Sequence, residues 1–235
     1  VRDGIIADLA ARGVGREATR LSRPQMRVVE AMCRKYCVDI DNARQVSHFA
    51  LDLFHSTEQL HRLPAEFGRL LNTAGWLHNA GHFISETGHH KHSAYIVSNS
   101  DLPGYTERER LLVALLCRYH RKTLPQSRHE PYKNLSVEEK RAICLLTPLL
   151  RLAVALDTGK EQKVATVECK AGPTAATLRI AGEGDLDLEI WATEWAADVF
   201  RQQQRVLDVS GEIRQRFEDR FEIANRHTLL QQVFQ

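Results

Sequence analysis

Residues 88–110 read GHHKHSAYIVSNSDLPGYTERER, and this stretch shows the helix signals that recur through most of the chain. Ser93–Asn99 has the spacing of a short helix, and Asp101–Gly104, with its Pro and Gly, predicts a turn. Thr106 is followed three residues later by Glu109, which is the capping-box signal for the start of a second helix. The sequence therefore predicts two helices joined by a tight turn near its centre.

Helical spacing of apolar residues extends outward on both sides of this stretch. Further helices are predicted at Arg23–Tyr36, at Asn42–Leu60, from Pro64 to His78, and from a capping box at Ser136–Glu139 to Asp157, with a kink near Pro148. Leu124–Leu135 contains two prolines and is expected to be a surface loop. Almost everything before residue 160 is thus expected to be helical.

The pattern changes after Gly159, where apolar and polar residues begin to alternate. The expected elements are strands at Lys163–Lys170 and Thr174–Ala181, a hairpin turn at Ala171–Pro173, a third strand at Asp185–Trp191 and a helix at Trp195–Val206. The predicted fold is mainly α: a helical domain over residues 1–160, followed by a small α+β domain over residues 161–235.

Composition excludes several classes of protein. Hydrophobic residues make up 43 % of the 235 residues, enough for a core, and 32 basic against 30 acidic residues give a net charge of +2. A specific nucleic-acid binder usually carries a larger basic excess, so we expect none here. No apolar run is long enough to span a bilayer. The five scattered cysteines favour reduced thiols and a cytoplasmic protein.

Histidine is concentrated in one region, because Trp76–Tyr95 holds five of the eleven. A candidate metal site draws one or two residues from each of several helix ends: His48, His78, Asn79, His92, His120 and Asp157. Neutral imidazole is the commonest metal ligand near neutral pH. The alternative for each histidine taken singly is a helix cap or a hydrogen-bonded group of the core.

The order of these residues resembles that of the HD-domain superfamily of helical metal-dependent phosphohydrolases, in which His, His-Asp, further His and a last Asp follow one another. Longer stretches look like the C-terminal half of the exopolyphosphatase / guanosine pentaphosphate phosphatase family: residues 88–110, RYHRK at Arg118–Lys122 and LLRLAVALD at Leu149–Asp157. The opening VRDGIIADL resembles the segment that links the actin-like domains of this family to its helical half.

The resemblance implies an HD-like helical bundle, and it implies that hydrolysis and binding belong to different domains. In that family hydrolysis is attributed to actin-like N-terminal domains, with Mg²⁺, and no glycine-rich phosphate loop of that kind is found in the first half of this chain. We therefore expect a C-terminal module that binds polyphosphate or guanosine pentaphosphate and supports a homodimer. A start at Val1 rather than Met suggests a fragment.

The residue after His78 departs from the HD pattern. Asn79 can offer a carbonyl oxygen but no charge, and hard divalent cations prefer carboxylate to amide. We therefore expect weakened or absent dinuclear binding. A single divalent ion, Mg, Mn, Zn or Ni, held by the histidines stays as an alternative.

A second interpretation of the same region is an anion site. Positive or protonatable groups gather at two helix ends: His89, His90, Lys91, Arg118, Arg121 and Lys122. A helix N-terminus near His92 favours anions, and Arg and Lys both bind phosphate. For Arg121 and Lys122 the alternative is a favourable interaction with the dipole of a helix C-terminus.

Two other functions are compatible with the sequence. One is an autonomous HD phosphohydrolase, in which a metal activates water and His120 assists proton transfer. The other is a non-enzymatic module that senses a nucleotide. The first requires a metal at the histidines, and neither is distinguished from phosphate-chain binding by the sequence alone.

Overall fold

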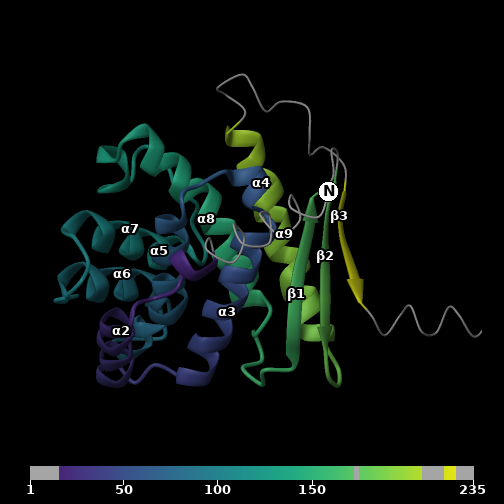
Figure 1. The fold of residues 1–235 in the computed structure, drawn as a ribbon, viewed down its shortest axis with the longest axis horizontal. Helices are drawn as coiled ribbons and strands as arrows, with labels where there is room; N and C mark the ends of the chain where they lie inside the picture. The colour runs from purple at the N-terminus through teal and green to yellow at the C-terminus, as the bar shows by residue number, and fades with distance from the viewer. Residues whose placement is uncertain (1–15, 172–174, 208–219, 226–235) are drawn as a thin grey trace, which may run out of the picture.

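The computed structural model describes residues 16–171, 175–207 and 220–225. Its helices are α2 (Arg23–Lys35), α3 (Ile40–Ser56), α4 (Glu58–His61), α5 (Ala65–Leu77), α6 (His89–Asn99), α7 (Glu107–Tyr119), α8 (Val137–Ala155) and α9 (Asp187–Leu207), with 3₁₀ turns η1 (Ala80–Phe83) and η2 (Tyr132–Asn134). Its strands are β1 (Val164–Ala171), β2 (Ala175–Gly182) and β3 (Arg220–Asn225). Helices α2–α8 form one side of the structure and the sheet forms the other (Figure 1). The mainly α fold is thereby confirmed. None of the described helices combines the length and hydrophobicity that crossing a bilayer requires.

Three helices begin with capping boxes. The side chains of Ser22, Thr106 and Ser136 accept hydrogen bonds from the third residue of α2, α7 and α8, and a Gln or Glu at that residue reaches back to the cap. Each box satisfies two backbone N–H groups that a helix start leaves unpaired. The predicted starts of α7 and α8 are therefore confirmed, and α8 continues through Pro148 to Ala155.

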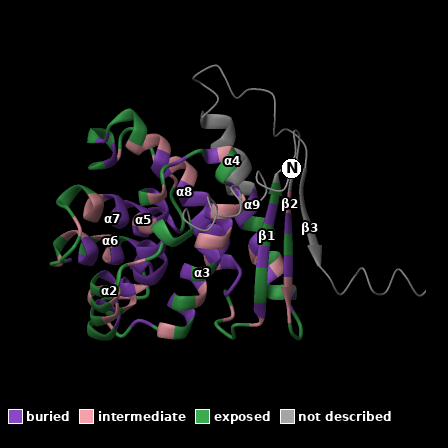
Figure 2. Ribbon diagram, in the orientation of Figure 1, coloured by how far each residue is buried: buried purple, intermediate pink, exposed green. Residues whose placement is uncertain are grey.

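The core lies where α3, α5, α7 and α8 meet, as the buried residues in Figure 2 show. Phe49, Leu71, Leu116 and Leu150 are completely buried there, one from each helix. Burial of each such side chain stabilises the fold by roughly 1.5–3 kcal/mol. Both α5 and α7 end at a histidine of this core, so packing fixes where those histidines lie.

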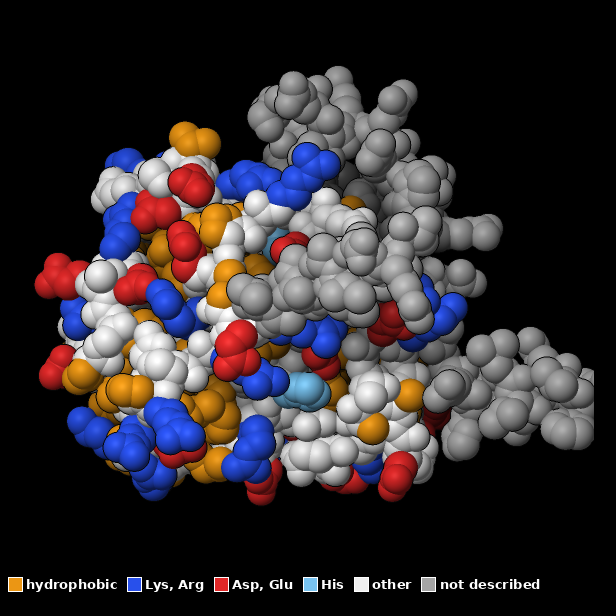
Figure 3. Space-filling view, viewed as in Figure 1, with side chains coloured by type: hydrophobic (Ala, Val, Ile, Leu, Met, Phe, Trp, Pro, Cys, Tyr) orange, Lys and Arg blue, Asp and Glu red, His pale blue; other side chains and the backbone are white. Residues whose placement is uncertain are grey.

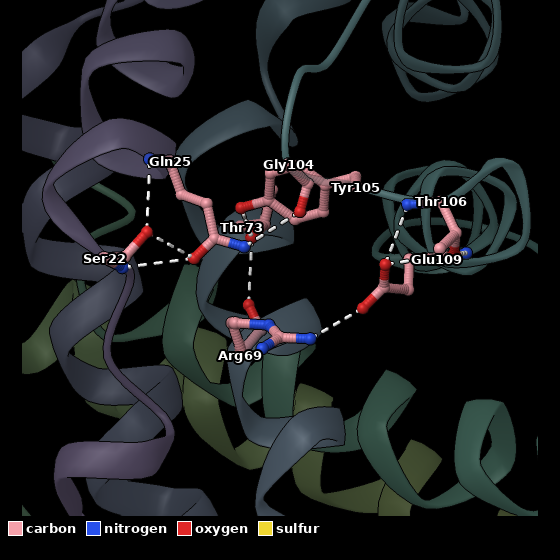
Figure 4. A network of polar contacts seen from close by, with 8 residues as sticks. All are labelled: Ser22, Gln25, Arg69, Thr73, Gly104, Tyr105, Thr106 and Glu109. Atoms are coloured by element: carbon pink, nitrogen blue, oxygen red, sulfur yellow. Dashed lines mark hydrogen bonds and ion pairs between the residues drawn. The ribbon is translucent and has the colours of Figure 1, made fainter.

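The turn before α7 is fixed by a network of side chains from three elements (Figure 4). Gln25 of α2 donates from Nε2 to the carbonyl oxygen of Gly104 at 3.1 Å. The hydroxyl groups of Thr73 and Tyr105 lie 2.8 Å apart, and Arg69 of α5 donates to Glu109 at 2.6 Å. This network orients α7 relative to α2 and α5.

The sheet has the order β1-β2-β3. β1 and β2 pair antiparallel, with Val167 opposite Ile180, while β3 pairs parallel to β2. Residues 172 and 173 of the predicted hairpin turn lie outside the described residues. The buried side chains of β1 and β2 join the same core as the helices, so the division of the chain at residue 160 stays a prediction.

Two predicted elements differ from the structure. The predicted strand at Asp185–Trp191 is wrong, because α9 begins at Asp187. The alternating letters DLDLEI suggested period two, but Leu186 is buried and Leu188 is 50 % exposed, which fits one face of a helix. The predicted helix Asn42–Leu60 is divided into α3 and α4 at Thr57, which is the cap of both helices.

Candidate functional site

Five histidines from four elements come together at one end of the helical core. His78 follows α5, His82 lies in η1, His89 and His90 begin α6, and His120 follows α7. The ring centroids of His78 and His120 are 5.1 Å apart, those of His89 and His120 are 5.4 Å apart, and those of His82 and His89 are 3.9 Å apart and stacked. We call these five side chains the imidazole cluster.

Backbone carbonyl groups fix the protonation of three of these rings. Nδ1 of His78 lies 2.7 Å from the Gly75 oxygen, Nδ1 of His120 lies 2.6 Å from the Cys117 oxygen, and Nδ1 of His89 lies 3.3 Å from the Glu86 oxygen. A carbonyl oxygen only accepts, so each Nδ1 carries the hydrogen and donates it. In the neutral ring the Nε2 atom is then an acceptor that points into the cluster.

These Nε2 atoms have few partners. Nε2 of His89 lies 3.4 Å from Nε2 of His120, and Nε2 of His78 is buried with no hydrogen-bond partner among the described residues. Nδ1 of His90 is also buried and unpartnered there. Two acceptors that face each other form a hydrogen bond only when one ring takes a second proton. The cluster therefore lacks positive hydrogen-bond donors in its neutral form and would gain them on protonation.

Burial favours the neutral form of His78, His89, His90 and His120. The pKa of each of His78, His89 and His90 is lowered to about 4, first by burial and in part by neighbouring imidazoles. The pKa of His120 is well below the usual value, first because of burial and then because of His78. Desolvation disfavours the charged form of histidine, and adjacent like charges add to the effect.

Four basic residues lie close enough to the cluster to act on it electrostatically: Lys91, Arg118, Arg121 and Lys122, which we call the cationic rim. Lys122, Lys91 and Arg118 all act electrostatically on His90, and Arg121 acts on His89. Lys91, Arg121 and Lys122 are exposed to solvent. The structure thus places together the six residues that the sequence suggested for phosphate binding.

The start of α6 has no side-chain cap. Its N-cap is Gly88, in the left-handed region at φ 76°. No atom lies within 4 Å of the position that a Cβ of Gly88 would occupy. Free N–H groups and the helix dipole both favour an anion at such a position.

A short hydrogen-bond chain fixes His78 against α6. The Ser93 hydroxyl donates to the carbonyl oxygen of His78 at 2.6 Å and accepts from the backbone N–H of Gly81 at 2.8 Å. Gly81 is in such close contact with α6 that a Cβ there would overlap the backbone of His89 and Ser93. The geometry of the imidazole cluster therefore depends on η1 lying tightly against α6.

Amide side chains, rather than imidazoles, surround Asp157. Nδ2 of Asn79 donates to Oδ1 of Asn42 at 3.3 Å, and Nδ2 of Asn42 donates to Oδ2 of Asp157 at 2.8 Å. Gln162 donates to the same carboxylate from its backbone N–H at 3.0 Å and from Nε2 at 3.2 Å. We call Asn79, Asn42, Asp157 and Gln162 the amide chain.

The six predicted metal ligands therefore lie in separate places. His78 and His120 belong to the imidazole cluster, and Asn79 and Asp157 belong to the amide chain. His48 lies on the outer face of α3, with its side chain 58 % exposed and Nε2 3.4 Å from Oδ2 of Asp52. His92 is half-buried beside Gly81 and makes no ring contact with the imidazole cluster in the part of the chain that the structure describes.

The donor set does not fit the two-metal HD arrangement. Asn79 brings an amide where that arrangement needs an anionic bridge, and the Asp157 carboxylate already accepts three hydrogen bonds. Within residues 16–171, 175–207 and 220–225, no three His, Cys, Asp or Glu side chains are grouped so as to hold a metal ion.

Comparison with known proteins identifies the family of this chain. The model of the family "Ppx/GppA phosphatase, domain III" matches residues 25–211, which include every residue of the imidazole cluster and of the amide chain. The chain belongs to the Ppx/GppA phosphatase family. The match confirms the resemblance to the helical half of that family.

Individual relatives of this Ppx/GppA domain III are distant. A guanosine-5'-triphosphate,3'-diphosphate pyrophosphatase of Aeromonas hydrophila subsp. hydrophila is 29 % identical over 181 residues, which cover 76 % of this chain and 36 % of the relative. An enzyme of the same name from Pseudoalteromonas translucida is 28 % identical over 139 residues, which cover 59 % of this chain and 27 % of the relative. The matched region is thus about a third of the length of these relatives.

Two buried polar residues of this Ppx/GppA domain III were missed in the sequence. Asn42 is 3 % exposed and Arg151 is 4 % exposed. The available signal was a polar residue among buried positions: Asn42 precedes Ala43 and Val46 on one face of α3, and Arg151 interrupts the apolar run Leu149–Leu156. A polar side chain on a buried face needs a partner, but the sequence does not say which one.

Proposed function

We propose that this Ppx/GppA domain III binds a phosphate chain, either polyphosphate or the phosphates of guanosine pentaphosphate, over the imidazole cluster and the cationic rim. The observation that carries the proposal is the buried Nδ1 of His90, which has no partner among the described residues and belongs to a ring on which Lys91, Arg118 and Lys122 act electrostatically. In this proposal hydrolysis is assigned to actin-like N-terminal domains, as the family resemblance implies.

The chemistry of the site suits a polyanion. The rim supplies forked guanidinium contacts and ammonium point charges, and the uncapped start of α6 supplies backbone N–H groups. A bound phosphate oxygen would also favour a second proton on an imidazole, since an adjacent negative charge raises the pKa of histidine. That proton would convert the contact between the His89 and His120 Nε2 atoms into a hydrogen bond.

Replacing Lys122 by Gln should weaken the binding of tripolyphosphate roughly tenfold and lower the slope of log K against log salt by about one. The reason is the loss of one phosphate-neutralising charge from the rim. Isothermal titration between about 50 and 200 mM salt measures both quantities. Orthophosphate should bind more weakly than tripolyphosphate, and the chain with Mg²⁺ should release no phosphate from tripolyphosphate.

The matched control is Arg27→Gln. Figure 3 shows Lys and Arg side chains gathered over α2, where Arg23, Arg27, Arg34 and Lys35 are exposed. If the phosphate chain binds at the imidazole cluster, Arg27→Gln leaves the affinity unchanged. Equal losses in the Arg27 and Lys122 variants would instead indicate binding to positive charge in general and would refute the site.

The proposal includes a homodimer, for which α9 offers a surface. Leu188, Trp191 and Trp195 lie at i, i+3 and i+7 on one face of this helix and are 50, 67 and 60 % exposed. Large aromatic side chains that line one exposed helix face are typical of protein interfaces.

Changing Trp191 and Trp195 to Ser together should convert a dimer to a monomer in sedimentation-velocity experiments. Tyr95→Ser is the matched control, because Tyr95 is 65 % exposed on α6, and it should leave the dimer intact. A parent protein that sediments as a monomer at every accessible concentration would rule out this part of the proposal.

A further inference from the structure

Arg151 of α8 is a buried cation without a counter-ion. Its side chain is 4 % exposed, and no carboxylate pairs with it among the described residues. Burial alone lowers the pKa of its guanidinium to about 10. A buried charge is costly unless its donors are satisfied, so the partners that it does have are informative.

Those partners are the two ends of one turn. Nε of Arg151 donates to the carbonyl oxygen of Tyr119 at 2.8 Å, and Nη2 donates to the carbonyl oxygen of Thr123 at 2.9 Å. Between these two carbonyl groups lie His120, which belongs to the imidazole cluster, and Arg121 and Lys122, which belong to the cationic rim. One guanidinium therefore bridges the whole segment that joins the cluster to the rim.

This turn needs support. Lys122 has φ 61°, in the left-handed region that a side chain with a Cβ adopts only at a cost of about 1–2 kcal/mol. Such a conformation persists only when the surrounding structure holds it. Donation to carbonyl groups on both sides of Lys122 is a contact of that kind. Arginine suits this role because its planar fork presents several donors at fixed angles, whereas lysine presents a single ammonium group.

We propose that Arg151 is a positioning residue for phosphate-chain binding: it holds the turn between Tyr119 and Thr123 so that His120, Arg121 and Lys122 face one ligand. This inference rests on the proposed function of the same site. Arg151 acts through the turn and does not touch the ligand. Its loss should therefore weaken binding without removing a phosphate contact.

The test compares Arg151→Lys and Arg151→Met with Arg141→Met. Arg141 is the matched control, because its Nη2 donates to the carbonyl oxygen of His61 at 2.8 Å, outside the turn and the cluster. Arg151→Lys should raise the dissociation constant for tripolyphosphate roughly tenfold through the loss of preorganisation, and its salt slope should stay that of the parent. Arg141→Met should leave binding unchanged.

Hydrogen exchange separates positioning from general destabilisation. In Arg151→Lys the hydrogen-bonded amides of the last turn of α7, up to Tyr119, should exchange faster while those of α3 and α5 keep the rates of the parent. Arg151→Lys keeps a buried charge, so it decides the test if Arg151→Met does not fold.

Two outcomes are distinguishable failures. If Arg151→Lys binds like the parent while Lys122→Gln binds weakly, the positioning role is wrong and the binding site stands. If Lys122→Gln also binds like the parent, the proposed function fails, and the role of Arg151 in it fails as well.

Discussion

Lowering the pH from about 7.5 to about 5 should reduce the free energy of unfolding of this chain by about 2 kcal/mol or more. Burial lowers the pKa of His78 from 6.5 to about 4, so between these values the folded state binds fewer protons than the unfolded state. Stability then rises with pH through this window and is fully present above 6.5. His89 and His90, whose pKa values are also about 4, act in the same direction.

Urea unfolding at the two pH values measures this difference. Acidic groups contribute little at pH about 5; the pKa of Glu139, for example, is lowered to about 2 by its hydrogen bond to Arg108, so its contribution is lost only in stronger acid. His78→Asn is the informative variant, because its amide can donate to the Gly75 oxygen but does not titrate. About 2 kcal/mol of the pH-dependent difference should disappear in it. Equal stability of the parent at both pH values would mean that the imidazole cluster is not buried as described.

Gly81→Ala should destabilise the protein by about 3 kcal/mol or more and abolish tripolyphosphate binding. A Cβ at this position would overlap the carbonyl oxygen of His89 and the backbone nitrogen of Ser93, and would lie 2.8 Å from Cβ of His92. Backbone atoms cannot move aside as the end of a flexible side chain can. The start of α6 would have to separate from η1, which would displace His89 and His90 from the cluster.

Thermal unfolding followed by circular dichroism measures this cost, and Gly88→Ala is its matched control. Gly88 lies seven residues later, at the N-cap of α6, and no atom lies within 4 Å of its would-be Cβ. Gly88→Ala should lower the free energy of unfolding by only about 1 kcal/mol, because alanine would have to adopt the left-handed φ of 76°. If the two variants are equally stable, the close contact between Gly81 and α6 is not a feature of the protein.

Local signals in the sequence were sufficient to predict much of the helical part of the fold. The capping boxes that begin with Thr106 and Ser136 predicted the starts of α7 and α8, because both partners of each box lie within four residues of one another. The cationic rim was suggested for a similar reason, since Arg118, Arg121 and Lys122 surround one helix end. In both cases the sequence itself brings the interacting groups close together.

Contacts between distant elements could not be read in this way. His48 and Asn42 both lie on α3, and the order of histidines favoured His48. The helix turns Asn42 towards Asp157 and His48 towards solvent, so the amide is the residue that reaches the carboxylate. The face of a helix that meets a particular neighbour is decided by packing across the core, and this is why Asn42 and Arg151 were missed.

The secondary structure of short segments with alternating polar and apolar residues could not be predicted either. Asp185–Trp191 alternates as a strand would, yet α9 begins within it, at Asp187. The carboxylates of Asp187 and Glu189 lie in the first turn, where they interact favourably with the helix dipole, and the helix buries Thr193 and Ala196 at helical intervals. Over seven residues a period of two and a period of 3.6 are hard to distinguish, and contact with α8 decides the outcome.

Polyphosphates are chelators: their oxygens are the ligands that Mg²⁺ seeks. A divalent cation that joined α3, α5 and α8 would be lost readily to the phosphate chain that we propose this domain binds. Here hydrogen atoms of Asn42 and Gln162 hold the Asp157 carboxylate, and those hydrogens cannot be extracted by a sequestering ligand. The junction can therefore keep its shape in the presence of a compound that strips metal from other proteins.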